Sequence, residues 1–177
     1  GEIDRLAERE RVVAMDVRGD LQALDIEELA ASLEAGPVLY EGNPFIAKVL
    51  QTDRRMDPVP RISLFVSPVS REEIEDLLAM RDRVDPADVV TDIMRRKLLR
   101  RTRKQKGELS LPDLENIERR AGSAWKEIRM APIFDAVVVN HDGEDSENWD
   151  AFPLPVGEAR LALQRVREGF FGKGTGG

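Results

Sequence analysis

Two short apolar runs constrain the fold of this chain more than any other feature. The first is RISLFVS at residues 61–67, and the second is DAVVVN at residues 135–140. A strand with one face in water alternates apolar and polar residues, whereas a strand covered by helices on both faces is largely apolar throughout. We therefore expect residues 62–66 and 136–139 to be buried parallel strands of one sheet.

The rest of the chain alternates between further β-rich runs and helices. Residues 11–17 and 37–41 are the other two β-rich runs. Three helix starts carry capping signals, in chain order Asp25 with Glu28, Ser70 with Glu73, and Asp85 before Pro86. Apolar residues at three- and four-residue spacing predict helices near residues 112–129 and 159–170. This alternation indicates an α/β domain with a largely parallel sheet.

Composition excludes several classes of function. No run approaches the roughly 18 uncharged apolar residues of a membrane span, so we expect no membrane partner. The chain has no cysteine, which excludes disulfides and thiolate metal sites and fits a cytoplasmic location. Its net charge of −7 argues against general affinity for nucleic acid.

Several motifs occur in a specific order. RISLFVSPVSREEIEDLLAMR, residues 61–81, combines an apolar strand, a proline and a Ser-Arg-Glu-Glu helix start; arginines follow, and FDAVVVNHDGED stands at residues 134–145. This order and spacing resembles the guanylate kinase family. The resemblance implies a P-loop-kinase-like, three-layer α/β domain with a mainly parallel sheet and a lid insertion. It divides the chain into an acceptor region with its helix (1–36), a core (37–80), a lid with a basic helical insertion (81–130), a core strand with the final helix (131–170) and a disordered tail (171–177).

The resemblance also implies an activity. It is the transfer of the ATP γ-phosphate, with Mg²⁺, to a nucleoside monophosphate or a similar small phosphate. Arginine suits this chemistry because its guanidinium group binds phosphate oxygens bidentately. The candidate catalytic residues of the lid are Arg81, Arg83, Arg95 and Arg96.

The nucleotide-contacting residues match the family less completely. Asn140 matches the asparagine that lies by the adenine of ATP in the resembled family. Val13 and Gln22 stand where that family has a glutamate and a tyrosine at the acceptor site. Asp16 and Glu41 are the acids that could bind the acceptor instead, with ordinary solvent-exposed acids as the other interpretation.

The triphosphate-binding loop of this class is missing from the 177 residues. Such a loop has the pattern G-x-x-x-x-G-K-[ST], and residues 172–175, GKGT, match only its end because Arg167 replaces the leading glycine. Residues 2–20 resemble the late part of the family's monophosphate-binding region, with its turn at residues 17–20. We therefore expect these residues to belong to a longer polypeptide and to be inactive alone; the other interpretation is that something replaces the family's central strand.

Three alternatives remain open. A catalytically inactive, guanylate-kinase-like protein-interaction module is favoured by Val13 and Gln22, whereas the arginine-rich lid favours the enzyme. Residues 95–106 hold eight basic residues in twelve, which could bind nucleic acid, but a solvated lid helix is preferred. The acids around the single histidine indicate a surface loop and no metal site, and these residues are His141, Asp142, Glu144 and Asp145.

Overall fold

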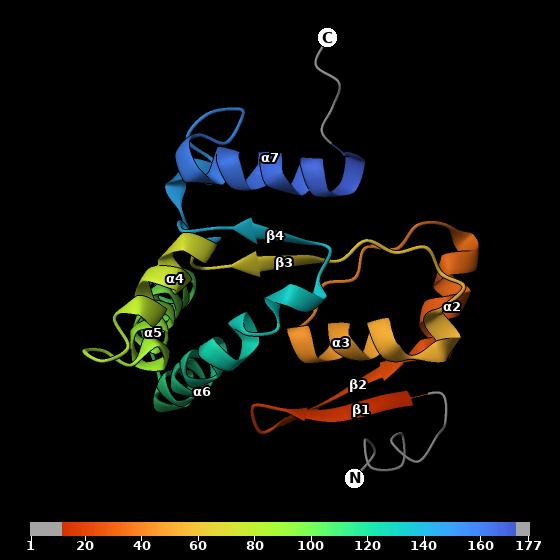
Figure 1. The fold of residues 1–177 in the computed structure, drawn as a ribbon, viewed down its shortest axis with the longest axis horizontal. Coiled ribbons are helices and arrows are strands. Elements are labelled where there is room, and N and C mark those ends of the chain that lie inside the picture. Colours follow the sequence, from red (N-terminus) through yellow and green to blue (C-terminus); the bar gives the residue numbers. More distant parts are fainter. Residues whose placement is uncertain (1–11, 173–177) are drawn as a thin grey trace. The chain divides into compact units, whose positions relative to one another are not determined.

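The computed structural model describes residues 12–172 and has a mixed α/β fold (Figure 1). Its main elements, in chain order, are β1 (Val12–Val17), β2 (Asp20–Asp25), α2 (Ile26–Ala35), α3 (Pro44–Thr52), β3 (Leu64–Ser67), α4 (Arg71–Ala79), α5 (Pro86–Lys106), α6 (Leu111–Ile128), β4 (Ala136–Val139) and α7 (Gly157–Phe171). The chain divides into two compact units, residues 1–61 and 62–177. None of the helices in the described part is long and apolar enough to cross a membrane.

The first unit contains an antiparallel hairpin of β1 and β2. Val17 pairs with Asp20, and between them Arg18 and Gly19 have φ angles of 62° and 85°. Two successive left-handed residues form the type I′ turn that matches the twist of a two-residue hairpin. The predicted turn at residues 17–20 is confirmed, whereas the β2 strand was not expected. Residues 2–11, also included in the predicted acceptor region, lie outside the described part.

Two helices follow the hairpin in this unit. The side chain of Asp25 accepts hydrogen bonds from the backbone N–H groups of Glu27 and Glu28 and so starts α2 as predicted. Residues 37–41 were predicted to be a strand, and this is wrong: they form no strand. Pro37 lacks a backbone donor, and no strand of the described chain pairs with this segment, so nothing stabilises an extended conformation there.

The second unit contains the predicted parallel pair. β3 and β4 pair in parallel, with Leu64 opposite Ala136 and Ser67 opposite Val139, as the two apolar runs predict. The side chain of Asp135 accepts two hydrogen bonds of 2.7 Å, from the N–H and the hydroxyl of Ser63, at the start of the pair. The fold is therefore α/β with a parallel pair, and the finer assignment to the guanylate kinase type remains a proposal.

Burial of the two strands differs from the expectation. Phe65 and Val138 are buried, but Val66 is 59% exposed and Val137 is 45% exposed. Helices α5 and α6 cover Phe65 on one face, while α7 contacts β4 (Figure 1). On each face of the β3–β4 pair, the helices cover mainly one of the two strands. The expectation that both runs are buried throughout is therefore confirmed only in part.

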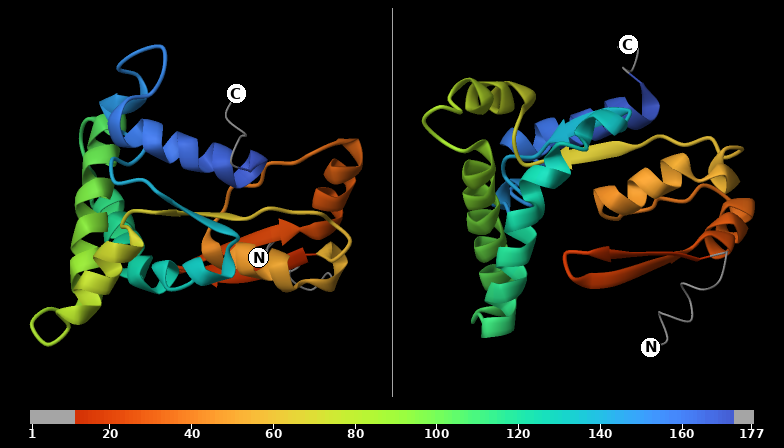
Figure 2. Two further views of the ribbon diagram at one scale, coloured as in Figure 1. Left: turned by 45° about the horizontal axis from the view of Figure 1, so that its top comes forward. Right: turned by 60° about the horizontal axis from the view of Figure 1, so that its bottom comes forward.

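The helices of the second unit form the larger part of its core. Phe65 and Val69 pack with Val90 of α5 and with Ala124 and Ile128 of α6. Beyond this cluster, α5 and α6 run side by side as a long helical hairpin (Figure 2). A second cluster holds the hairpin together and consists of Leu98, Ile117 and Ala121. The predicted helix at residues 112–129 is confirmed as α6.

Candidate functional site

Both parallel strands of the second unit end at the same edge of their sheet. After β3 the chain passes through residues 68–70 to α4, and after β4 it enters the loop at residues 140–146. Open α/β sheets bind their ligands outside the carboxyl ends of the strands. We call residues 67–70 and 140–146 the carboxyl edge and treat it as the candidate site.

Lys97 of α5 joins the two halves of the carboxyl edge. Its ammonium group donates hydrogen bonds to the carbonyl oxygens of Pro68, at 3.3 Å, and Asn140, at 3.1 Å. Burial lowers the pKa of Lys97, and the nearby positive charge of Arg100 lowers it further. Because one ammonium group holds the segments that follow both strands, Lys97 is a positioning residue of this edge.

His141 lies between two carboxylates at the same edge. Its Nε2 is 2.8 Å from Oε2 of Glu73 in α4, and its Nδ1 is 3.2 Å from Oε2 of Glu158 in α7. These contacts raise the pKa of His141, chiefly through the hydrogen bond to Glu73. The backbone N–H of Ser70 and the His141 ring lower the pKa of Glu73. The histidine therefore connects β4 with the first turns of two helices.

The loop after β4 is held by its own side chains. The side-chain oxygen of Asn140 accepts a 3.0 Å hydrogen bond from the N–H of Gly143, which has a φ of 78° that only glycine adopts without strain. Oδ2 of Asp142 accepts a 2.6 Å hydrogen bond from the amide group of Asn148, and the indole of Trp149 donates to the Gly143 carbonyl at 2.8 Å. Asn140 is thus oriented by its own loop.

The basic residues of α5 bind this acidic loop. Nε of Arg100 donates to Oδ2 of Asp145 at 2.6 Å, and Lys104 donates to the Asp145 carbonyl at 2.9 Å. Arg101 forms an ion pair with Glu144. The Asp145 side chain is only 7% exposed, and its hydrogen bond to Arg100 lowers its pKa. Both the basic run and the acidic loop were expected to be solvated, but the structure pairs them with each other.

Replacing Asp145 with asparagine is expected to lower the free energy of unfolding by about 1 kcal/mol, because a charge-assisted hydrogen bond becomes a neutral one. The cost is limited because Arg100 is 58% exposed. Folding lowers the carboxyl pKa, so the contribution is present above the unfolded-state value near 3.8 and lost as pH falls through the folded-state value. Urea denaturation of both proteins near neutral and acid pH measures this. Equal stabilities near neutral pH would contradict it.

The four predicted lid arginines form two separate groups. Arg81 and Arg83 lie in the turn between α4 and α5, where they line a shallow hollow together with Asp85 and Pro86. Neither guanidinium group has an ion-pair partner within residues 12–172. About 14 Å of helix, at 1.5 Å per residue, separates the start of α5 from Arg95.

Arg95 and Arg96 are already paired with acids. Arg95 binds both carboxylate oxygens of Glu118 in α6, at 2.6 and 2.9 Å. Arg96 pairs with Asp92, one turn earlier in α5, at 2.6 Å. These bonds hold the Arg95 guanidinium against α6, so it would have to leave Glu118 to meet a phosphate.

The two acids predicted to bind the acceptor belong to the first unit. Oδ1 of Asp16 accepts a 2.9 Å hydrogen bond from the N–H of Gly19 and so stabilises the hairpin turn. Glu41 is exposed in the segment before α3. The amide oxygen of Gln22 accepts a 2.5 Å hydrogen bond from Asn43, the residue that caps α3. Asp16 thus stabilises the hairpin turn, and Gln22 holds the residue that caps α3.

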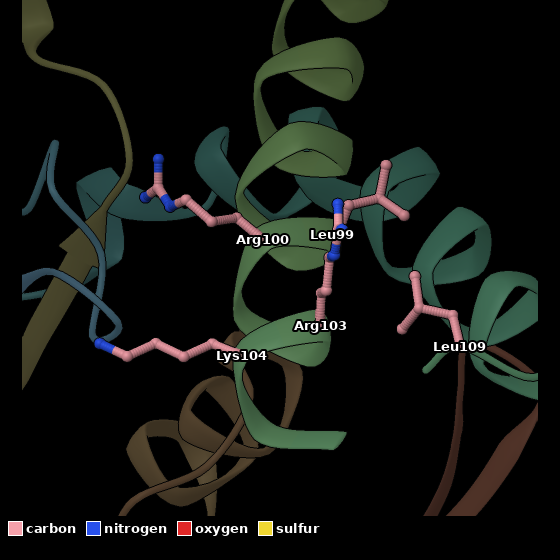
Figure 3. A pocket seen from close by; sticks show the side chains of 5 residues that line it. All are labelled: Leu99, Arg100, Arg103, Lys104 and Leu109. Carbon is pink, nitrogen blue, oxygen red and sulfur yellow. The ribbon is translucent and has the colours of Figure 1, made fainter. Parts of the chain in front are cut away.

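A second hollow lies beside the C-terminal half of α5 and encloses about 550 Å³. In Figure 3, Arg100 and Lys104 point to the side of α5 away from Leu109, whereas Leu99 points to the side where Leu109 lies and Arg103 runs along the helix toward Leu99. Since Arg100 and Lys104 are bound to Asp145, this hollow offers few free polar groups to a ligand. In the part of the chain that the structure describes, no three histidines or acids are grouped to hold a metal ion.

No family model matches the chain, and no curated protein or solved structure matches it either. Function is therefore inferred from the residues themselves. Three residues that contact the carboxyl edge were not among the predicted site residues, namely Glu73, Lys97 and Glu158. Glu73 had been recognised only as a helix-capping residue. Nothing in the sequence pairs it with His141, 68 residues away.

Proposed function

We propose that this chain is part of a guanylate-kinase-like phosphotransferase, which moves the γ-phosphate of ATP to a nucleoside monophosphate or a similar small phosphate. The parallel pairing of β3 with β4 carries the proposal, because it matches the strand arrangement that the resemblance requires. Asn140 directly after β4 and the arginines after α4 agree with it. The type I′ turn at residues 17–20 also agrees with the resembled turn.

The described residues supply only part of such a site. Arg81 and Arg83 would bind the transferring phosphoryl group, since they have no ion-pair partner in the described part of the chain. Asn140 would contact the base through its side-chain amide group. The sequence contains no G-x-x-x-x-G-K-[ST] pattern to bind a triphosphate, so ATP and Mg²⁺ do not fit these residues alone. That pattern would come from a segment outside them.

The direct test is a phosphoryl-transfer assay on the full-length protein with Mg²⁺-ATP and a panel of nucleoside monophosphates. Formation of ADP that depends on one acceptor supports the proposal. Formation of no ADP with any acceptor, by a folded protein, would contradict it. The alternative, a protein-interaction module without catalysis, is favoured by the internal pairing of Arg95 with Glu118.

The isolated 177-residue chain is expected to show no tight binding of Mg²⁺-ATP. The sequence lacks the G-x-x-x-x-G-K-[ST] pattern, whose backbone N–H groups and lysine bind the β- and γ-phosphates, and lid arginines alone provide weak, exposed contacts. Isothermal titration calorimetry measures this directly. Micromolar affinity would mean that these residues contain a phosphate site of another kind.

A further inference from the structure

His141 is the only histidine of the chain, and both of its ring nitrogens face carboxylates. Nε2 faces Glu73 at 2.8 Å, and Nδ1 faces Glu158 at 3.2 Å. A neutral imidazole has one N–H and one lone pair, so it can donate to only one of these acceptors. The other nitrogen would direct its lone pair at a carboxylate oxygen. Only the imidazolium form satisfies both contacts.

The two carboxylates lie on separate helices, and each is in the first turn of its helix. Oε2 of Glu73 also accepts a 2.6 Å hydrogen bond from the N–H of Ser70 and completes the capping box of α4. By contrast, α7 has no side-chain cap, because Val156 stands at its N-cap position. The contact between Glu158 and His141 therefore links the uncapped first turn of α7 to the residues that follow β4, beside the 2.9 Å backbone hydrogen bond from Val156 to Asn148.

We propose that His141 is a pH-sensitive pin that holds the first turns of α4 and α7 to the carboxyl end of β4 while its ring is protonated. The pin acts at the carboxyl edge, where ligands of such sheets bind. Loss of the His141 contacts would therefore release the first turn of α7 from that edge. This inference does not depend on the phosphotransferase proposal, because it concerns the fold of the second unit alone.

Other charged groups also lie near these contacts, and the cation among them, Lys97, shares Glu73 with His141. From α5, Lys97 adds positive charge close to Glu73, and from the loop Asp142 and Asp145 add negative charge close to Lys97. Hydrogen bonding raises the pKa of His141 above its ordinary 6.5. The pin therefore stabilises the fold fully below about 6.5 and is lost as pH rises through the folded-state pKa. At the acid end it weakens as Glu73 is protonated, below its ordinary 4.5.

The first test is an NMR titration of the single histidine in a protein without a histidine tag. The wild-type pKa is expected to lie above 6.5, and Glu158→Gln should lower it because one charged acceptor is lost. Glu147→Gln is the matched control, an exposed acid at a neighbouring position that does not contact His141. A wild-type value at or below 6.5, or the same value in Glu158→Gln, would overturn the proposal.

The second test measures the pin itself by hydrogen–deuterium exchange, corrected for the intrinsic effect of pH on amide exchange. At residues 160–163, whose amides close the first turn of α7, His141→Gln should raise the frequency of opening roughly two- to fivefold over wild type near pH 5.5, as expected for a partly exposed ion pair. At a pH well above the folded-state pKa that the NMR titration gives, the two proteins should exchange alike. A difference that is the same at both pH values would show a pH-independent packing role and contradict the pin.

Discussion

Replacing Phe65 with alanine is expected to lower the free energy of unfolding of the second unit by about 3–5 kcal/mol. Phe65 is 6% exposed and packs against Val90 of α5 and Ile128 of α6. Its ring also lies 5.3 Å from that of Phe134, in a tilted arrangement that adds to the packing. The substitution would leave a cavity where β3 meets the helices, which backbone relaxation fills only in part.

The control for this prediction is Val66→Ala, on the same strand. Val66 is 59% exposed, so its loss should cost less than about 1 kcal/mol. Urea denaturation followed by tryptophan fluorescence reports on both variants, because Trp125 and Trp149 both lie in the second unit. If Phe65→Ala is too unstable to fold, Phe65→Leu should cost less than about 1.5 kcal/mol. Equal losses at the two positions would mean that the helices do not cover β3 as the structure has it.

The elements with strong local signals could be predicted from the sequence. Ser70 and Glu73 start α4 with a complete capping box, and Asp85 before Pro86 starts α5. The two apolar runs pair as predicted because each can satisfy its backbone only beside another strand. Each capping signal and each apolar run is contained within a few consecutive residues. They do not depend on how distant segments are arranged.

The errors concern strands, whose formation depends on a segment that pairs with them and not only on their own residues. Residues 37–41 are as apolar as a strand, but a strand forms only where another segment pairs with it, and here none of the described residues does. The β2 strand was missed for the converse reason. Its sequence, DLQALD, mixes polar and apolar residues, and the strand forms because the turn at Arg18 and Gly19 brings it beside β1.

The candidate site was predicted less well than the fold. The arginines of α5 were read from their composition as one cationic group. Composition does not show which of them meet acids, and the structure pairs Arg95 with Glu118 and Arg100 with Asp145, 23 and 45 residues away. Once these pairs are known, Arg81 and Arg83 are the stronger candidates for phosphate binding, since they lack such partners in the described part of the chain.

If the full-length protein is a kinase, Arg83→Ala is expected to lower kcat on the order of a hundredfold or more. The charge that Arg83 would meet is concentrated on the phosphoryl group during transfer, so its contribution should appear mainly in the transition state. KM for the acceptor should change less, because the base and phosphate of the acceptor are held elsewhere. The kcat of Arg83→Lys should lie between those of the wild type and Arg83→Ala, since lysine keeps the charge but not the bidentate geometry.

Arg95→Ala separates the roles of the two arginine groups in the same assay. The family resemblance predicts a loss of kcat similar to that of Arg83→Ala, which requires Arg95 to leave Glu118 during turnover. In that case Glu118→Gln, which weakens the pairing, should leave kcat unchanged or raise it. If Arg95 only joins α5 to α6, both variants should retain wild-type kcat. Wild-type kcat in Arg83→Ala would remove the α4–α5 turn from the site, and a protein without turnover would favour the interaction module.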